Sequence, residues 1–138
     1  MKEVIHKLEL KIFSDTLQLY LVEEFVKHIF LEYALDNRLF IKVLICVNEA
    51  TVNSISHGNQ YDTNKKITIS YEYREQTLFF RIKDQGDGFD FDHIPDPTTK
   101  ENIMKETGRG IYLLKHLARE ITFKEKGRVI EFSIVLNE

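Results

Sequence analysis

The chain has 138 residues, and its 22 acidic and 19 basic side chains give a net charge of −3. This balance argues against a nucleic-acid-binding protein, because such proteins usually present a basic surface. Apolar residues make up 43% of the chain, which argues against disorder as a bulk property. We therefore expect one folded domain over residues 1–138.

The single cysteine and the distribution of apolar residues indicate where the protein works. Cys46 lies in an apolar run with Ile45 and Val47, so we expect a buried core thiol, and one cysteine excludes a disulfide within the chain. No apolar run approaches the roughly 20 residues that span a bilayer. The N-terminal residues alternate in polarity, unlike a signal peptide. We therefore expect a cytoplasmic protein without a membrane segment.

Hydrophobic periodicity divides the chain into strands and helices. The expected elements, in chain order, are a strand at 2–13, a helix capped by Ser14 and Asp15 that runs to about Ala34, a helix from about Arg38 to His57 that stops at Gly58, strands at Lys66–Tyr73 and Thr77–Asp84, a loop at 85–108, a helix from about Gly110 to Ala118, and strands at 119–125 and 128–136. The short link Glu75-Gln76 predicts that the second and third strands form a hairpin.

The order of these elements predicts the fold class. Strands that cluster as hairpins, with helices between them, favour an α+β fold over a doubly wound parallel sheet. We expect a two-layer α/β sandwich, with helices on one face of a mixed, mostly antiparallel sheet.

A polar stripe is expected on the second helix, which is apolar almost all round at its start. Glu49, Asn53 and His57 are spaced four residues apart and therefore line one helix face. The carboxamide oxygen of Asn53 suits a Mg²⁺ ion that is held mainly by phosphates and water. Glu49, one turn away, can accept a proton from a hydroxyl group or water. The alternative interpretation is a satisfied polar seam or a solvent-facing stripe.

The end of the third strand carries an acidic residue followed by glycines. Asp84 shares the parity of Phe80 and Ile82, so its carboxylate points toward the inward face of the sheet. There it can accept a hydrogen bond from the amino group of a base in an apolar pocket. Gly86 and Gly88 let the backbone approach a ligand closely. The alternative interpretation is an ordinary turn between two elements.

The long loop at 85–108 breaks the periodic pattern, and a loop of this length in a compact domain is usually functional. Residues 89–106 are a candidate lid over bound phosphates. Thr98 and Thr99 in this segment either contact phosphate or cap the lid.

Three residues at the start of the next helix, Gly108, Arg109 and Gly110, form a candidate phosphate site. Backbone N–H groups at a helix start bind phosphate with help from the helix dipole, and Arg109 can add a fixed cation. The alternative interpretation is a flexible loop that ends in a helix.

The order and spacing of these motifs resemble the ATP-binding boxes of the GHKL ATPase superfamily, which has the Bergerat fold. The matching segments are Glu49-Ala50-x-x-Asn53-x-x-x-His57-Gly58, Asp84-x-Gly86-x-Gly88 and Gly108-Arg109-Gly110. The short chain, the form of the first segment and a DPTT run in the expected lid are similar to one branch, the anti-sigma-factor serine kinases. These proteins regulate bacterial stress responses and sporulation by partner switching. The resemblance extends from about residue 14 to the end of the chain.

The resemblance implies a role for each matched residue. Asn53 would hold Mg²⁺, and Glu49 would be the general base toward a serine hydroxyl of a partner protein. The other matched residues would bind ATP: Asp84 at the adenine amino group, Gly86 and Gly88 around the adenine, His57 within the first segment, and Gly108, Arg109 and Gly110 around the phosphates.

The resemblance also implies partners and an activity. Members of this branch are protein serine/threonine kinases that phosphorylate a STAS-type antagonist protein and sequester a sigma factor when not so engaged, commonly as dimers. We therefore expect protein partners, a possible homodimer, and no direct contact with nucleic acid or membrane. Two alternatives stay open: a non-catalytic module whose partner binding depends on ATP, and a detached histidine-kinase-type ATPase domain.

Overall fold

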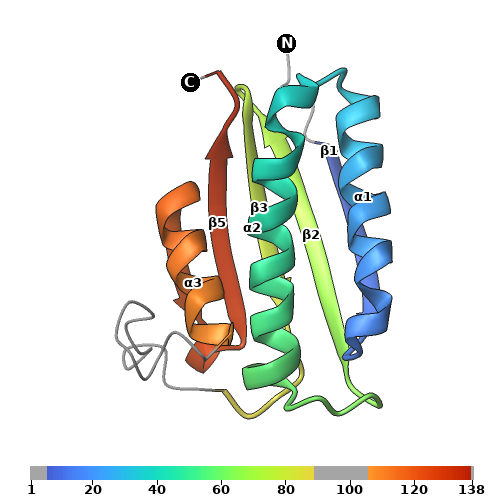
Figure 1. Cartoon of the computed structure of the whole chain (residues 1–138), viewed down its shortest axis with the longest axis vertical. Helices are drawn as coiled ribbons and strands as arrows, with labels where there is room; N and C mark the ends of the chain where they lie inside the picture. Colours follow the sequence, from blue (N-terminus) through green and yellow to red (C-terminus); the bar gives the residue numbers. More distant parts are fainter. Residues whose placement is uncertain (1–5, 89–105, 138) are drawn as a thin grey trace.

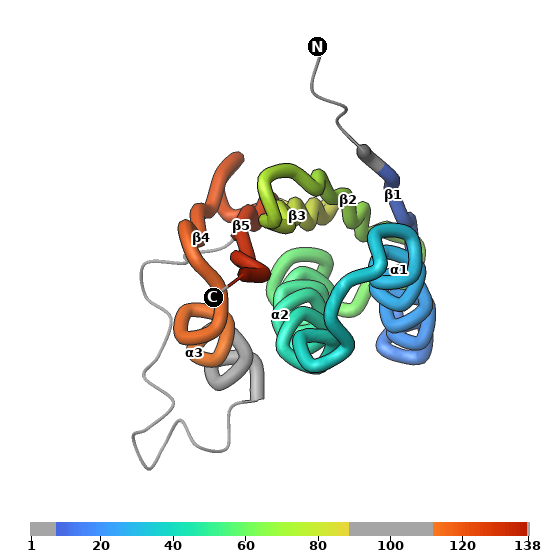
Figure 2. The backbone as a smooth tube through the Cα atoms, turned by 90° about the horizontal axis from the view of Figure 1, so that it is seen from above, coloured from blue at the N-terminus to red at the C-terminus, as the bar shows by residue number. Residues whose placement is uncertain are grey.

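The structure, a computed structural model, describes residues 6–88 and 106–137, with side chains for 8–88 and 112–137. The strands are β1 His6–Phe13, β2 Lys66–Arg74, β3 Thr77–Lys83, β4 Arg119–Lys124 and β5 Val129–Val135, and the helices are α1 Leu19–Glu32, α2 Phe40–Asn53 and α3 Glu106–Leu117. The strands form one sheet of order β1-β2-β3-β5-β4. All three helices cover the same face of this sheet (Figures 1 and 2).

The predicted two-layer α+β sandwich is confirmed, and every strand pairing in the described sheet is antiparallel. The expectation of a mixed sheet is therefore wrong for this part of the chain. The reason lies in the connections. The antiparallel pair α1 and α2 returns the chain to the end of the sheet where β1 finishes, so β2 runs back along β1 (Figure 1). The connection from β3 through α3 places β4 one strand position away from β3. Strand β5 then fills the position between them and pairs antiparallel with both.

The hairpin between β2 and β3 is confirmed. Its two link residues, Glu75 and Gln76, have φ angles of 51° and 56°. Two consecutive residues with positive φ form the tight turn whose twist matches that of the flanking strands. The hairpin sets the register so that the inward-facing residues of the two strands lie opposite each other, Tyr71 with Phe80 and Ile69 with Ile82.

The core lies between the sheet and the helices. The inward residues of β2 and β3 are buried, as their alternation predicted: Ile67, Ile69, Tyr71, Leu78, Phe80 and Ile82. Helix α2 lies at the centre of the helical layer, between α1 and α3 (Figure 2), and contributes Val43, Cys46, Val47 and Ala50 to the same core. Strand β1 is an edge strand of the described sheet, and its Leu8 is 45% exposed.

The entry to α1 follows the predicted cap only in part. The carboxylate of Asp15 accepts a hydrogen bond from the Leu17 N–H at 2.9 Å and caps the 3₁₀ turn Thr16–Gln18 that leads into the helix. Ser14 is not a cap. Its hydroxyl is buried and accepts a hydrogen bond from the side chain of Asn59, far along the chain.

The second helix is longer than α2 itself. A 3₁₀ turn, Asn37–Leu39, precedes it, and a π-helical turn, Ser54–Gly58, continues it without a break. By length and composition alone, the whole stretch Asn37–Gly58, with 22 residues, is long and apolar enough to cross a membrane, although no continuous apolar run in the sequence is that long. A helix buried at the centre of a domain core meets the same criteria, and α2 occupies that position here.

Helix α3 begins at Glu106, four residues before the expected start at Gly110. Gly108, Arg109 and Gly110 therefore lie inside the helix and not ahead of it.

The single cysteine tests the packing of α2. Cys46 is fully buried, and this burial raises the pKa of its thiol to about 11. We expect the native protein at pH 8 to react with a thiol-specific chromogenic disulfide roughly hundredfold more slowly than the unfolded chain, because only the thiolate reacts. The rate is measured with and without guanidinium chloride. Equal rates in the two solutions would show that α2 is not packed as described.

Candidate functional site

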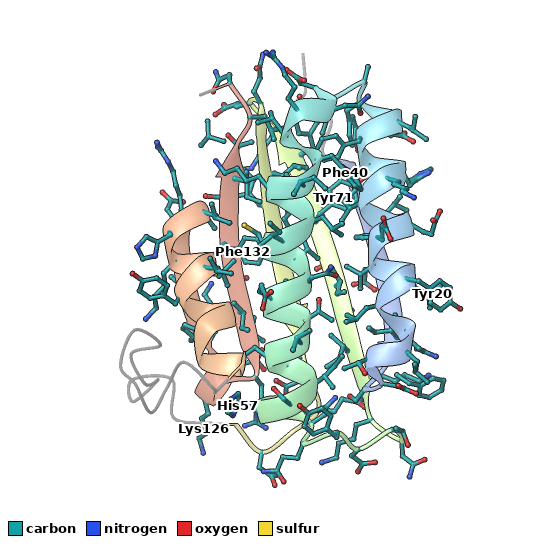
Figure 3. All side chains as sticks on the ribbon, in the orientation of Figure 1. Tyr20, Phe40, His57, Tyr71, Lys126 and Phe132 are labelled. Atoms are coloured by element: carbon teal, nitrogen blue, oxygen red, sulfur yellow. The ribbon has the colours of Figure 1, made fainter. Side chains whose placement is uncertain are left out.

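The predicted site residues gather at one end of the molecule, where α2 and its π-helical turn finish. The loop after β3 and the turn between β4 and β5 reach the same end. His57 and Lys126 both lie there (Figure 3). The contacts that join these segments are made by Gly58, Asp84, Gly86 and Gly88.

Asp84 directly follows β3, and its side chain is only 1% exposed, as its parity with Ile82 predicted. One carboxylate oxygen, Oδ1, accepts a hydrogen bond from the Gly86 N–H at 2.8 Å. The other, Oδ2, is buried and has no hydrogen-bond partner among the described residues. A buried acceptor without a partner is costly, so this oxygen is suited to accept a donor from a bound ligand.

The surroundings of Asp84 perturb its ionisation. Burial raises the pKa of the carboxyl group above its usual value, while the Gly86 N–H and the charges of Arg128 and Lys65 act in the opposite direction. A buried carboxyl group with a perturbed pKa and an unpartnered oxygen is typical of functional sites.

Glycines allow the end of the helix and the loop after β3 to touch. A Cβ atom on Gly58 would overlap the Asp84 carboxylate, and a Cβ atom on Gly86 would overlap the carbonyl oxygen of Gly58. Gly88 has a φ angle of +94° and packs against the backbone of Lys126, in the turn between β4 and β5. The helical stretch ends at Gly58, as expected. Gly58 has no positive φ angle, so the glycine serves this close approach and not a left-handed turn.

Helix α2 brings two more predicted residues to this end of the domain. Asn53 is 2% exposed, and its amide nitrogen has no hydrogen-bond partner among the described residues. Glu49, one turn earlier, is half-buried as expected. Ser54, which the sequence comparison treats as a harmless replacement of a small apolar residue, has a buried hydroxyl that also lacks a partner in the described part of the chain.

His57 does not share the environment of Asn53. After Asn53 the helix widens into the π-helical turn, in which the Asn59 N–H bonds to the Ser54 carbonyl at 2.8 Å. The wider turn moves His57 off the line of Glu49 and Asn53, and its side chain is exposed. Partial desolvation lowers the pKa of the His57 imidazole below its usual value. The expected three-residue polar stripe is therefore limited to Glu49 and Asn53.

The other expected site residues are described only in part. The backbone of Gly108, Arg109 and Gly110 lies in the first turns of α3, which packs against α2. The side chain of Arg109 lies outside the described residues. So does most of the expected lid, including Thr98 and Thr99.

A separate hollow lies on the opposite face of the sheet. It has a volume of about 990 Å³ and is lined by outward residues such as Glu72, Arg74 and Arg81. Charged pairs cross this face, among them Arg81 with Glu131 at 3.5 Å. None of the predicted site residues that the structure describes lines this hollow. It is therefore distinct from the candidate site.

Comparisons with known proteins agree with this arrangement. Residues 14–134 match the family model of the histidine kinase-like ATPase domain. The chain is 32% identical over 83 residues to the serine-protein kinase RsbW of Bacillus subtilis (strain 168). This match covers 56% of this chain and 52% of that protein. It is 33% identical over 97 residues to the serine-protein kinase RsbW of Staphylococcus aureus (strain MSSA476), which covers 64% of this chain and 61% of that protein. The matches thus span about half to three fifths of these curated relatives.

The family match contains all three motif segments of the predicted site and nearly the whole described fold. The resemblance found in the sequence is therefore confirmed at the level of the family. The chain belongs to the family of histidine kinase-like ATPase domains.

Proposed function

We propose that this domain binds ATP with Mg²⁺ and transfers the γ-phosphoryl group to a serine of a partner protein. The observation that carries the proposal is the buried Asp84 carboxylate, which keeps one oxygen without a partner and lies against Gly58. A buried acceptor without a partner is what an adenine amino group would need in order to be recognised by a hydrogen bond. The two RsbW relatives are named as serine-protein kinases, which supports the transfer step.

The phosphate end of the site rests on the segments around Asn53. In this proposal Asn53 contributes an oxygen to Mg²⁺, and the ion supplies charge neutralisation at the phosphates. The described residues contain no group of three or more His, Cys, Asp or Glu side chains that could hold a metal, so phosphates and water would supply most of its ligands. Gly108, Arg109 and Gly110 in the first turns of α3 would contact the phosphates, and His57 would lie at the edge of the nucleotide.

Glu49 is the proposed general base. It is half-buried and one helical turn from Asn53, so it stands next to the proposed metal ligand. The serine Oγ forms a bond to the γ-phosphorus while the bond from this phosphorus to the β–γ bridging oxygen breaks and ADP leaves. Glu49 takes the hydroxyl proton. Positioning and charge neutralisation supply most of the rate in such transfers.

The proposed partners follow from the branch that the motifs resemble. We propose a STAS-type antagonist protein as the phosphate acceptor, with a sigma factor as the second partner and a homodimer as the working form, in the cytoplasm. No direct contact with nucleic acid is part of this proposal.

The proposed role of Asn53 at Mg²⁺ can be tested by nucleotide binding. We expect ATP to bind the wild type in the presence of Mg²⁺, and Asn53→Ala to abolish the part of the affinity that depends on Mg²⁺. Calorimetric titrations with and without Mg²⁺ measure this difference. Asn64→Ala is the matched control, because Asn64 is exposed in the turn before β2. No binding to the wild type under either condition would overturn the proposed nucleotide site.

Asp84→Asn should separate ligand binding from stability. Loss of the carboxylate acceptor should weaken ATP binding by about 1–3 kcal/mol, which is roughly 5- to 150-fold. Because burial raises the pKa of Asp84, its charged form destabilises the free protein above that pKa. The variant should therefore unfold at higher denaturant than the wild type at pH 7, and the gain should vanish as the pH falls toward 3.8, the usual value for this group.

The control for this comparison is Asp87→Asn, an exposed aspartate in the same loop. It should leave the ATP affinity unchanged. Unchanged ATP affinity in Asp84→Asn would contradict the assignment of Asp84 to the adenine.

Glu49→Gln tests the chemical step. The variant should keep its ATP affinity and lose phosphotransfer by roughly 10²- to 10⁴-fold, the usual contribution of a general base. The measurement uses labelled ATP and a purified STAS-type antagonist protein, with Glu24→Gln on exposed α1 surface as the control. Full transfer by Glu49→Gln would exclude its role as base. Stable bound ATP with no labelled partner would favour the ATP-dependent binding module, and an acid-labile label would favour a histidine acceptor.

A further inference from the structure

A buried network of polar groups lies directly behind the loop that carries Asp84. Its centre is Asn59, which follows the π-helical turn and is only 1% exposed. The Asn59 side chain accepts a hydrogen bond from the Gln85 N–H at 2.7 Å. Its amide nitrogen donates to the Lys66 carbonyl at 3.0 Å and to the Ser14 hydroxyl. One side chain thus joins the end of β1, the start of β2 and the loop after β3.

The Asn59 network is tied to the helix that supports the site. The Asn59 N–H bonds to the Ser54 carbonyl at 2.8 Å, and the Asn59 carbonyl accepts from the Asp62 N–H at 3.0 Å. Gln85 is held a second time, because its side-chain oxygen accepts from the Lys66 N–H at 2.7 Å. The loop after β3 is therefore fixed to the end of the helix and to the sheet by side-chain hydrogen bonds.

The Gln85 N–H belongs to the peptide group that joins Asp84 to Gln85. A hydrogen bond to this N–H sets the plane of that peptide and so the direction of the Asp84 side chain. On its other side, the Asp84 N–H bonds to the Arg128 carbonyl at 3.0 Å. Backbone groups on both sides of the Asp84 Cα atom are therefore fixed, while its Oδ2 atom is left free of partners among the described residues.

We infer that Asn59 is a positioning residue for base recognition: it orients Asp84 so that the site selects adenine by its amino group. This inference rests on the proposed function. A buried carboxamide with its donors and acceptor all engaged locks a single geometry, because any movement of the loop would leave polar groups without partners. Support of this kind behind a ligand-binding side chain is what keeps a recognition site accurate.

The experiment compares Asn59→Ala with Ser14→Ala. Ser14→Ala removes one bond of the same buried network on the side away from the loop, so it controls for loss of stability alone.

Two quantities are measured on the full chain. The first is the hydrogen-exchange rate of the Gln85 amide in the free protein, relative to core amides. The second is the ratio of affinities for ATP and inosine triphosphate, whose base has a carbonyl in place of the amino group. We expect Asn59→Ala to raise the Gln85 exchange rate and to reduce the preference for ATP, each by roughly tenfold. Ser14→Ala should leave both unchanged.

Asn59→Asp provides the rescue. It keeps the oxygen that accepts from the Gln85 N–H but loses the amide donor to the Lys66 carbonyl and the Ser14 hydroxyl. If the bond to the Gln85 N–H is what orients Asp84, a folded Asn59→Asp variant should retain much of the Gln85 protection and of the preference for ATP, whether or not Asn59→Ala folds. A folded Asn59→Asp variant that loses both, beside an unaffected Ser14→Ala, would overturn the inference. So would an Asn59→Ala variant that keeps both. A wild type that binds neither nucleotide would overturn the proposed function and adenine selection together, whereas an unchanged preference in Asn59→Ala overturns the positioning role alone.

Discussion

The close approach of the Asp84 carboxylate to the Cα atom of Gly58 is the constraint on which the site depends. It joins the end of the sheet to the end of the central helix without an intervening side chain. Because Gly86 meets the Gly58 carbonyl in the same way, the helix end and the loop form one surface. The approach also excludes water from the carboxylate, which raises the pKa of Asp84 and makes a specific donor valuable to it.

Two kinds of buried polar group meet at this end of the molecule. The side chain of Asn59 uses its donors and its acceptor on protein partners, which is the behaviour of a structural group. Asp84, Asn53 and Ser54 each keep a buried atom without a partner in the described chain, as does Asn48 earlier on α2. Buried polar atoms in folded proteins are nearly always paired, so unpaired ones gathered near one surface indicate a ligand site. The contrast separates the residues that hold the site from those that face a ligand.

The central helix serves both the core and the site. Its first turns bury Val43, Cys46 and Val47 against the sheet, and its last turns carry Asn53 and the π-helical turn. A π-helical turn adds a residue to the winding and is frequent at functional sites. Here it separates the buried Asn53 from the exposed His57 and delivers Gly58 to the loop after β3. Functional groups on a packed helix are held more accurately than groups on loops alone.

The sequence by itself determined the alternation of β2 and β3, their hairpin, the inward direction of Asp84 and the family, because strand parity and motif spacing are local properties of the chain. Tertiary structure decided what depends on distant segments meeting. The local sequence predicts only that a helix ends at Gly58. The contact with the Asp84 carboxylate shows why a side chain is excluded at this position. The local sequence predicts that Ser14 is a helix cap and that Asn59 belongs to a polar turn. Only the folded sheet brings the two side chains together in one buried network. The change of helical winding after Asn53 was equally hidden, since local spacing predicts a straight α-helix and a widened turn is accommodated by packing at the helix end.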